Sequence, residues 1–283
     1  MWVGKPIKLR WLLNIKRKEV NNLNPTNEIK KLEEKYSING YKGISTKPVA
    51  VMSYGEIPIL ISASHSVKQK RNGELKSQEF YTGAIAEYLA KEVGCYVITK
   101  PYLLEVNYND DANYEDCRCA YKTAINQFLQ QNNIKLFVDI QGLSEKKKSV
   151  IDICIDGGIN SNNTDFPFIL QKDINEYFGE NSVTIDNYYK AEPINVLSKW
   201  VHNTYDIPSV ELEINGAYRW FESECEIQSL QLLDILYKWL KQCQNIIQPT
   251  LPFKISPCEG CTYEEQCALC DGEPECQLTN PKK

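Results

Sequence analysis

The chain has 283 residues, of which 42% are hydrophobic and 24% are charged, as in a globular protein with one large domain and appendages or two small domains. Its formal net charge of −5 argues against a general nucleic-acid binder, which needs an excess of clustered Lys and Arg. The sequence has no run of about 18 apolar residues, so no transmembrane helix is predicted. Its first residues lack the apolar stretch of a secretory signal. We therefore expect a cytoplasmic protein with no membrane and no nucleic-acid partner.

Residues 1–47 are interpreted as an N-terminal extension that packs on the core. A helix is predicted over residues 27–36, because Ile29, Leu32 and Tyr36 share one face at helical spacing. Residues 10–15 form a short apolar segment that fits either a strand or a docking segment.

Between residues 48 and 247 the sequence alternates short apolar runs with longer amphipathic stretches. The predicted strands are residues 58–63, 95–99, 135–140, 150–155 and 209–214. The predicted helices are residues 78–93, 116–132 and 224–243. Strands that alternate with helices of this length predict a three-layer α/β/α sandwich around a mostly parallel, mixed central sheet.

Polar residues stand where three of these predicted strands end. His65 follows the first strand, Asp139 and Gln141 close the third, and Glu213 lies near the end of the last. Functional groups in open α/β sheets gather at the carboxyl ends of the strands. We therefore expect one sheet to bring His65, Gln141 and Glu213 to a common edge.

Four segments of this region, in order, resemble the signatures of the N-formylglutamate amidohydrolase-like family. The matching residues are 64–66, 71–76 and 81–86 for the first signature, 109–114 for the second, 139–142 for the third, and 211–215 with 218–219 for the last. Each motif alone is weak, but their order and spacing make a chance similarity hard to accept.

The family belongs to the zinc-exopeptidase-like hydrolases, so the resemblance implies zinc or another divalent cation in this part of the chain. It implies that His65 and Glu79 are metal ligands and that Glu213 is the general base or acid. Gln141 stands at the place of the third metal ligand, and Asp139 would orient the ligand at that place without touching the cation itself. The plainer interpretation of Glu213 is a charged residue at a strand end.

Several further residues are candidates for gripping a substrate carboxylate or an oxyanion. They are Arg71, Asn72, Asn113 and Arg219, of which Asn113 and Arg219 are also candidate catalytic residues. The planar guanidinium of arginine matches a carboxylate with two hydrogen bonds. Either arginine could instead only hold loops together.

Gln141 departs from the family pattern, which has histidine at this place. An amide oxygen is a poorer zinc ligand than imidazole. Three explanations stay open: a replacement that disables the site, a naturally inactive relative, or a site for a different cation.

A cysteine-rich tail is predicted for residues 248–283, after prolines at 249, 252 and 257 mark a boundary. Its candidate ligands are Cys258, Cys261, Cys267, Cys270 and Cys276. Paired Cys-x-x-Cys units suit a tetrahedral zinc or an iron–sulfur cluster, and disulfides or free thiols are the alternative. The run resembles the auxiliary-cluster segment of some radical-SAM peptide-modifying enzymes.

Three functions follow from these patterns. The first is a metal-dependent amidohydrolase of a small N-acyl amino acid or peptide-like substrate that carries a carboxylate. The second is a non-catalytic protein that binds a peptide or a protein partner on a hydrolase scaffold. The third is a peptide-modifying enzyme that uses the tail for docking.

Overall fold

A computed structural model describes residues 24–43, 49–104, 109–114 and 120–248. The strands are β1 (Ala50–Ser53), β2 (Ile57–Ala63), β3 (Gln69–Arg71), β4 (Glu74–Lys76), β5 (Cys95–Thr99), β6 (Leu136–Leu143), β7 (Ile151–Cys154), β8 (Val183–Ile185) and β9 (Ser209–Asn215). The helices are α1 (Pro25–Tyr41), α2 (Thr82–Val93), α3 (Ala120–Gln131), α4 (Phe166–Phe178), α5 (Leu197–Tyr205) and α6 (Glu226–Ile247). The predicted segment 10–15 and the five tail cysteines lie outside the described residues.

Seven of the strands form one mixed sheet in the order β1-β5-β2-β6-β9-β7-β8. The central strands β5, β2, β6 and β9 are parallel to one another, whereas β1 and β7 run antiparallel to their neighbours β5 and β9. The strands β2, β6 and β9 are adjacent, so the three predicted strand ends meet in one sheet. The predicted fold class is confirmed.

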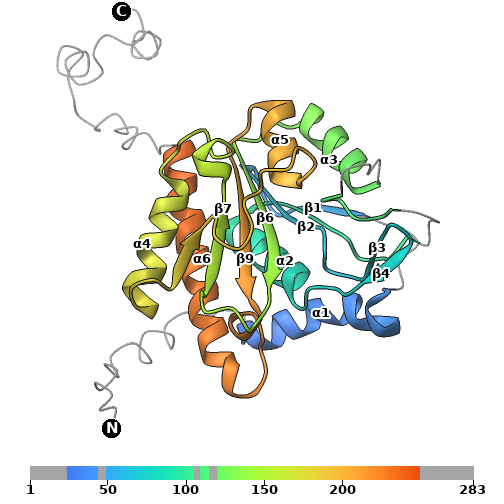
Figure 1. The fold of residues 1–283 in the computed structure, drawn as a ribbon, viewed down its shortest axis with the longest axis horizontal. Helices are drawn as coiled ribbons and strands as arrows, with labels where there is room; N and C mark the ends of the chain where they lie inside the picture. The colour runs from blue at the N-terminus through green and yellow to red at the C-terminus, as the bar shows by residue number, and fades with distance from the viewer. Residues whose placement is uncertain (1–23, 44–48, 105–108, 115–119, 249–283) are drawn as a thin grey trace, which may run out of the picture. The chain divides into compact units, whose positions relative to one another are not determined.

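Helices cover both faces of the sheet (Figure 1). The larger apolar cluster joins α2, α4 and α6, with Ile29 of α1, to one face of the sheet. The smaller cluster joins α3 and α5 to the other face through Leu60, Ile98 and Phe137. The three layers follow from two buried sheet faces that each require an apolar cover.

Polar side chains alternate with apolar ones along β6 and β9. Val138, Ile140 and Leu212 belong to the larger cluster, whereas Asp139 and Glu211, which are register partners, project to the opposite face because side chains alternate along a strand. A strand buried on both faces is usually apolar throughout. The polar row beside α5 is therefore the feature that ordinary packing does not require.

Some boundaries differ from the sequence prediction. The helix predicted from residue 78 begins at Thr82, because Tyr81 has φ 64° and cannot continue a right-handed helix. The helices α4 and α5 and the edge strands β1 and β8 were not predicted, since they are short or lie in mixed polar sequence. Within the described part of the chain, no helix has both the length and the apolar character needed to cross a membrane.

Candidate active site

The carboxyl ends of β2, β6 and β9 carry the predicted residues. His65 follows the end of β2 at Ala63, and Gln141 on β6 lies directly opposite Glu213 on β9. Glu79 reaches the same place from the turn before α2, where its N–H donates to the carbonyl of His65 at 2.9 Å. Segments distant in sequence thus meet at one edge of the sheet.

The imidazole of His65 lies between two carboxyl groups. Its Nδ1 is 3.0 Å from Oε1 of Glu79, and its Nε2 is 3.2 Å from Oδ1 of Asp111. Burial opposes protonation, but Glu79 and Asp111 outweigh it and raise the pKa of His65 well above its usual value. The ring is fixed at both nitrogen atoms.

Asp111 is fully buried and also binds Arg71. Nε and Nη2 of Arg71 donate to Oδ2 of Asp111 at 2.8 and 2.5 Å. Burial works against ionisation, yet His65 and Arg71 lower the pKa of Asp111 well below its usual range. Arg71 keeps about two fifths of its side chain exposed, so its remaining donors can reach a ligand.

The amide of Gln141 is buried and oriented by two acceptors. Its Nε2 donates to Oδ2 of Asp139 at 2.6 Å and to Oγ of Ser64 at 3.2 Å. Burial raises the pKa of Asp139, whose Oδ1 has no hydrogen-bond partner among the described residues. Because the amide nitrogen faces these two groups, the amide oxygen is the atom left for a ligand.

Glu213 and Glu211 are nearly enclosed on β9, with 8% and 3% of each residue exposed. Burial, together with the carboxyls of Glu79 and Glu211, raises the pKa of Glu213 well above its usual value. Burial and Asp139 raise the pKa of Glu211 to about 8, and Oγ of Ser198 donates to Glu211 at 3.1 Å. A carboxyl in this position can accept and release a proton.

Arg219 is 7% exposed and held by backbone carbonyls. Its Nε donates to the carbonyl of Ile214 at 3.0 Å, and its Nη1 donates to the carbonyl of Phe80. A Cβ added to Gly142 would lie 2.7 Å from Nη2 of Arg219 and 2.9 Å from Cβ of Glu79, so any other residue there would displace these side chains. Arg219 therefore braces the turn before α2, and its contact with a substrate stays a prediction.

The two asparagines are also engaged within the protein. Oδ1 of Asn113 accepts the N–H of Leu197 at 2.9 Å and so caps the start of α5. Nδ2 of Asn72 donates to the hydroxyl of Tyr114 at 2.6 Å on an exposed loop. Their substrate-binding roles stay predictions.

Three residues of this region were not singled out from the sequence. Asp111 lay inside the second motif, two positions before Asn113, and Glu211 could have been found from the alternation of polar residues along its strand. Glu33 of α1 accepts the N–H of Tyr81, two residues after Glu79, and nothing in the sequence connects it to the site.

The family resemblance implies a divalent cation, for which Nδ1 of His65 and Oε1 of Glu79 are two candidate ligands. If Nε2 donates its hydrogen to Asp111, the lone pair of Nδ1 lies beside Oε1 of Glu79, and two acceptors this close need a shared proton or cation. Among the described residues no three His, Cys, Asp or Glu side chains could hold a metal ion together. A third protein ligand would therefore be an oxygen such as that of the Gln141 amide, which suits manganese or magnesium better than zinc.

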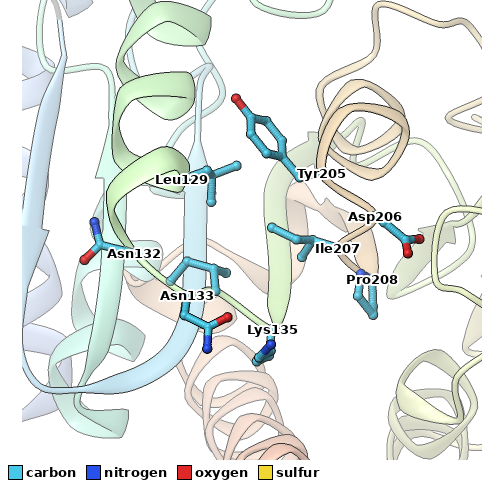
Figure 2. Close-up of a pocket in the computed structure, with 9 residues that line it drawn as sticks. Leu129, Asn132, Asn133, Lys135, Tyr205, Asp206, Ile207 and Pro208 are labelled. Atoms are coloured by element: carbon cyan, nitrogen blue, oxygen red, sulfur yellow. The ribbon is translucent and has the colours of Figure 1, made fainter.

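A separate hollow of about 250 Å³ lies at the opposite edge of the sheet, where β6 and β9 begin (Figure 2). Its lining residues are Leu129, Asn132, Asn133, Ile134, Lys135, Tyr205, Asp206, Ile207 and Pro208. No predicted site residue lines it. Because α/β sheets bind ligands at the carboxyl ends of their strands, the other edge of the sheet is the expected place for a functional site.

No family model and no curated protein matches the chain. Several solved structures are similar to it. A gene product of Agrobacterium tumefaciens, Atu2144, is 12% identical with a TM-score of 0.46, over 70% of this chain and 95% of that chain. A metallo-carboxypeptidase from Burkholderia cenocepacia is 10% identical with a TM-score of 0.43, over 71% of this chain and 66% of that chain.

An N-formylglutamate amidohydrolase is also among them. It comes from Ralstonia eutropha JMP134 and is 9% identical with a TM-score of 0.47, over 72% of this chain and 100% of that chain. At such identities and TM-scores the similarity carries no activity, substrate or metal over to this chain.

Proposed function

We propose that the chain is a divalent-cation-dependent hydrolase of an amide bond in a small N-acyl amino acid or peptide-like substrate that carries a carboxylate. The observation that carries this proposal is the pairing of Nδ1 of His65 with Oε1 of Glu79 at 3.0 Å, at the strand ends where Glu213 lies.

The charges of this region support a cation. Five carboxyl groups face one histidine and two arginines, namely Glu79, Asp111, Asp139, Glu211 and Glu213 against His65, Arg71 and Arg219. Burial and the neighbouring carboxyls raise the pKa values of Asp139, Glu211 and Glu213, so these groups hold protons that a bound cation would displace. His65 and Glu79 would hold the cation, with the amide oxygen of Gln141 as a further ligand.

Each group would then have its own role in the reaction. A bound divalent cation would supply a Lewis acid that polarises the scissile carbonyl and makes a nearby water more acidic. Glu213 would accept a proton from the attacking water and pass it to the leaving nitrogen as the C–N bond breaks. Arg71, at the exposed side of the site, would pair with the substrate carboxylate.

A second candidate is a non-catalytic protein that binds a carboxylate-bearing peptide at the same place. The bonds from the Gln141 amide to Asp139 and Ser64 favour it, because they give position 141 a role that needs no cation. Both candidates use Arg71, so carboxylate binding alone does not separate them.

Calorimetric titration with Mn²⁺ separates the two. Manganese prefers nitrogen and oxygen donors to thiolates, so it reports on this site rather than on the tail. The hydrolase predicts one bound ion, lost in His65→Ala and kept in His202→Ala, which changes the chain's other histidine. Replacement of Gln141 by His should tighten Zn²⁺ binding by at least about tenfold.

An activity assay completes the test. N-formyl- and N-acetylglutamate and simple acyl dipeptides are offered to the Mn²⁺-loaded wild type and to Glu213→Gln. Turnover that disappears in Glu213→Gln supports the hydrolase. No bound ion in the wild type, together with N-acyl glutamate binding that Arg71→Ala abolishes, would leave the non-catalytic function.

A further inference from the structure

The turn at residues 79–82 carries Glu79 and is held from outside. Its first N–H donates to the carbonyl of His65 at 2.9 Å, and Arg219 binds the carbonyl of Phe80. These contacts come from the loop after β2 and from the segment after β9. The direction of the Glu79 carboxylate therefore depends on distant parts of the chain.

The turn contains a strained residue. Tyr81 has φ 64°, a left-handed conformation that costs a bulky residue about 1–3 kcal/mol. It precedes the first residue of α2 and forms no side-chain cap there. Such a conformation persists only where the surroundings hold it in place.

The N–H of Gly142 donates to Oε2 of Glu79 at 2.6 Å, and Glu33 of α1 supplies a further contact to the turn. Its Oε1 accepts the N–H of Tyr81 at 2.9 Å and the hydroxyl of Tyr41 at 3.0 Å. Only 5% of Glu33 is exposed, and its Oε2 has no partner among the described residues. A buried carboxyl with one unsatisfied oxygen is costly, and a native protein that keeps one calls for an explanation.

We propose that Glu33 is a positioning residue, which holds the turn at residues 79–82 so that Glu79 faces His65. The consequence for cation binding rests on the proposed function, whereas the clamp itself does not. Helix α1 packs against α2 through Ile29 and through a bond from Tyr36 to Glu87, which fixes Glu33 beside the turn. Helix α1 thus contributes to the geometry of the candidate active site.

Amide hydrogen exchange of the whole chain tests the clamp directly. In Glu33→Ala the amide of Tyr81 should exchange at least about tenfold faster, the factor for one lost hydrogen bond. In Glu33→Gln the amide oxygen can still accept both bonds, so protection should return. The matched control is Glu34→Ala, which removes an exposed glutamate from the same helix.

The second measurement is Mn²⁺ affinity in the same variants. Glu33→Ala should weaken it by about tenfold or more, while Glu33→Gln and Glu34→Ala should leave it near the wild-type value. If no variant and no wild type binds the ion, the proposed function fails. The exchange of Tyr81 still decides the clamp in that case.

Two outcomes would overturn the proposal. One is unchanged exchange of Tyr81 in Glu33→Ala. The other is equal loss of protection at Tyr81 and at Val138 in the middle of β6, which would make Glu33 a general stability residue. Should the alanine variant not fold, Glu33→Met keeps the packing and removes the acceptor. The exchange of Tyr81 is then compared with that of Val138 in this variant.

Discussion

Glu33 should make the stability of the protein depend on pH. Burial is the main cause that raises the pKa of this carboxyl from 4.5 to about 7, against the hydrogen bonds from Tyr81 and Tyr41 that lower it. A raised carboxyl pKa means that the folded state binds the proton more tightly than the unfolded state. The resulting contribution of Glu33 to the free energy of unfolding is present in full below pH 4.5 and is lost as the pH rises through 7.

The magnitude follows from the two pKa values. Each pKa unit corresponds to 1.36 kcal/mol, so the shift would lower the free energy of unfolding by about 2.5 kcal/mol between pH 5 and pH 8. Glu33→Gln keeps an acceptor for the N–H of Tyr81 and has no proton to lose, so this position no longer titrates. The advantage of the variant over the wild type in free energy of unfolding should therefore be about 2.5 kcal/mol larger at pH 8 than at pH 5.

Urea unfolding at both pH values, followed by tryptophan fluorescence with a chelator present, measures this difference. Comparison with the wild type at each pH cancels the titration of other groups, provided that they act independently. Glu34→Gln, on the exposed side of the same helix, is the control and should show no pH-dependent difference. A Glu33→Gln difference that is the same at pH 5 and pH 8 would refute the reasoning.

Three further predictions concern other parts of the chain. Gly142→Ala should lower the free energy of unfolding by about 1–3 kcal/mol, measured by urea unfolding, because the new Cβ meets Arg219 at 2.7 Å. Asp111→Asn should weaken Mn²⁺ binding about 10- to 100-fold in calorimetry, because His65 loses the carboxylate that orients it; unchanged affinity would contradict this role. Cys261→Ser should release zinc or iron from the tail, measured by metal analysis, without lowering the unfolding midpoint of the body.

The sequence was enough to predict the layers and the central strands, since the apolar runs of β2, β6 and β9 are clear. It also placed Gln141 and Glu213 at one edge, because both end such runs in parallel strands. The separation of polar and apolar residues along β9 was visible in residues 211–215, and Glu211 could have been included on that ground.

Other features depend on contacts that no local pattern encodes. The start of α2 at Thr82 is set by Tyr81, whose left-handed conformation is stabilised by Glu33 from another helix. Asp111 acts through His65 and Arg71, which approach it from residues about 40 positions away in the chain. Only tertiary structure reveals such partners.

Strand β9 is the last strand among the described residues but lies between β6 and β7 in the sheet. Residue 137 of β6 pairs with residue 209, and residue 151 of β7 pairs with residue 214. During synthesis, the edges of β6 and β7 would stay open to wrong pairing until β9 has left the ribosome. A nascent chain stopped before residue 209 should therefore aggregate or require a chaperone. The insertion of β9 closes the sheet and brings Glu213 to the other site residues in the same step.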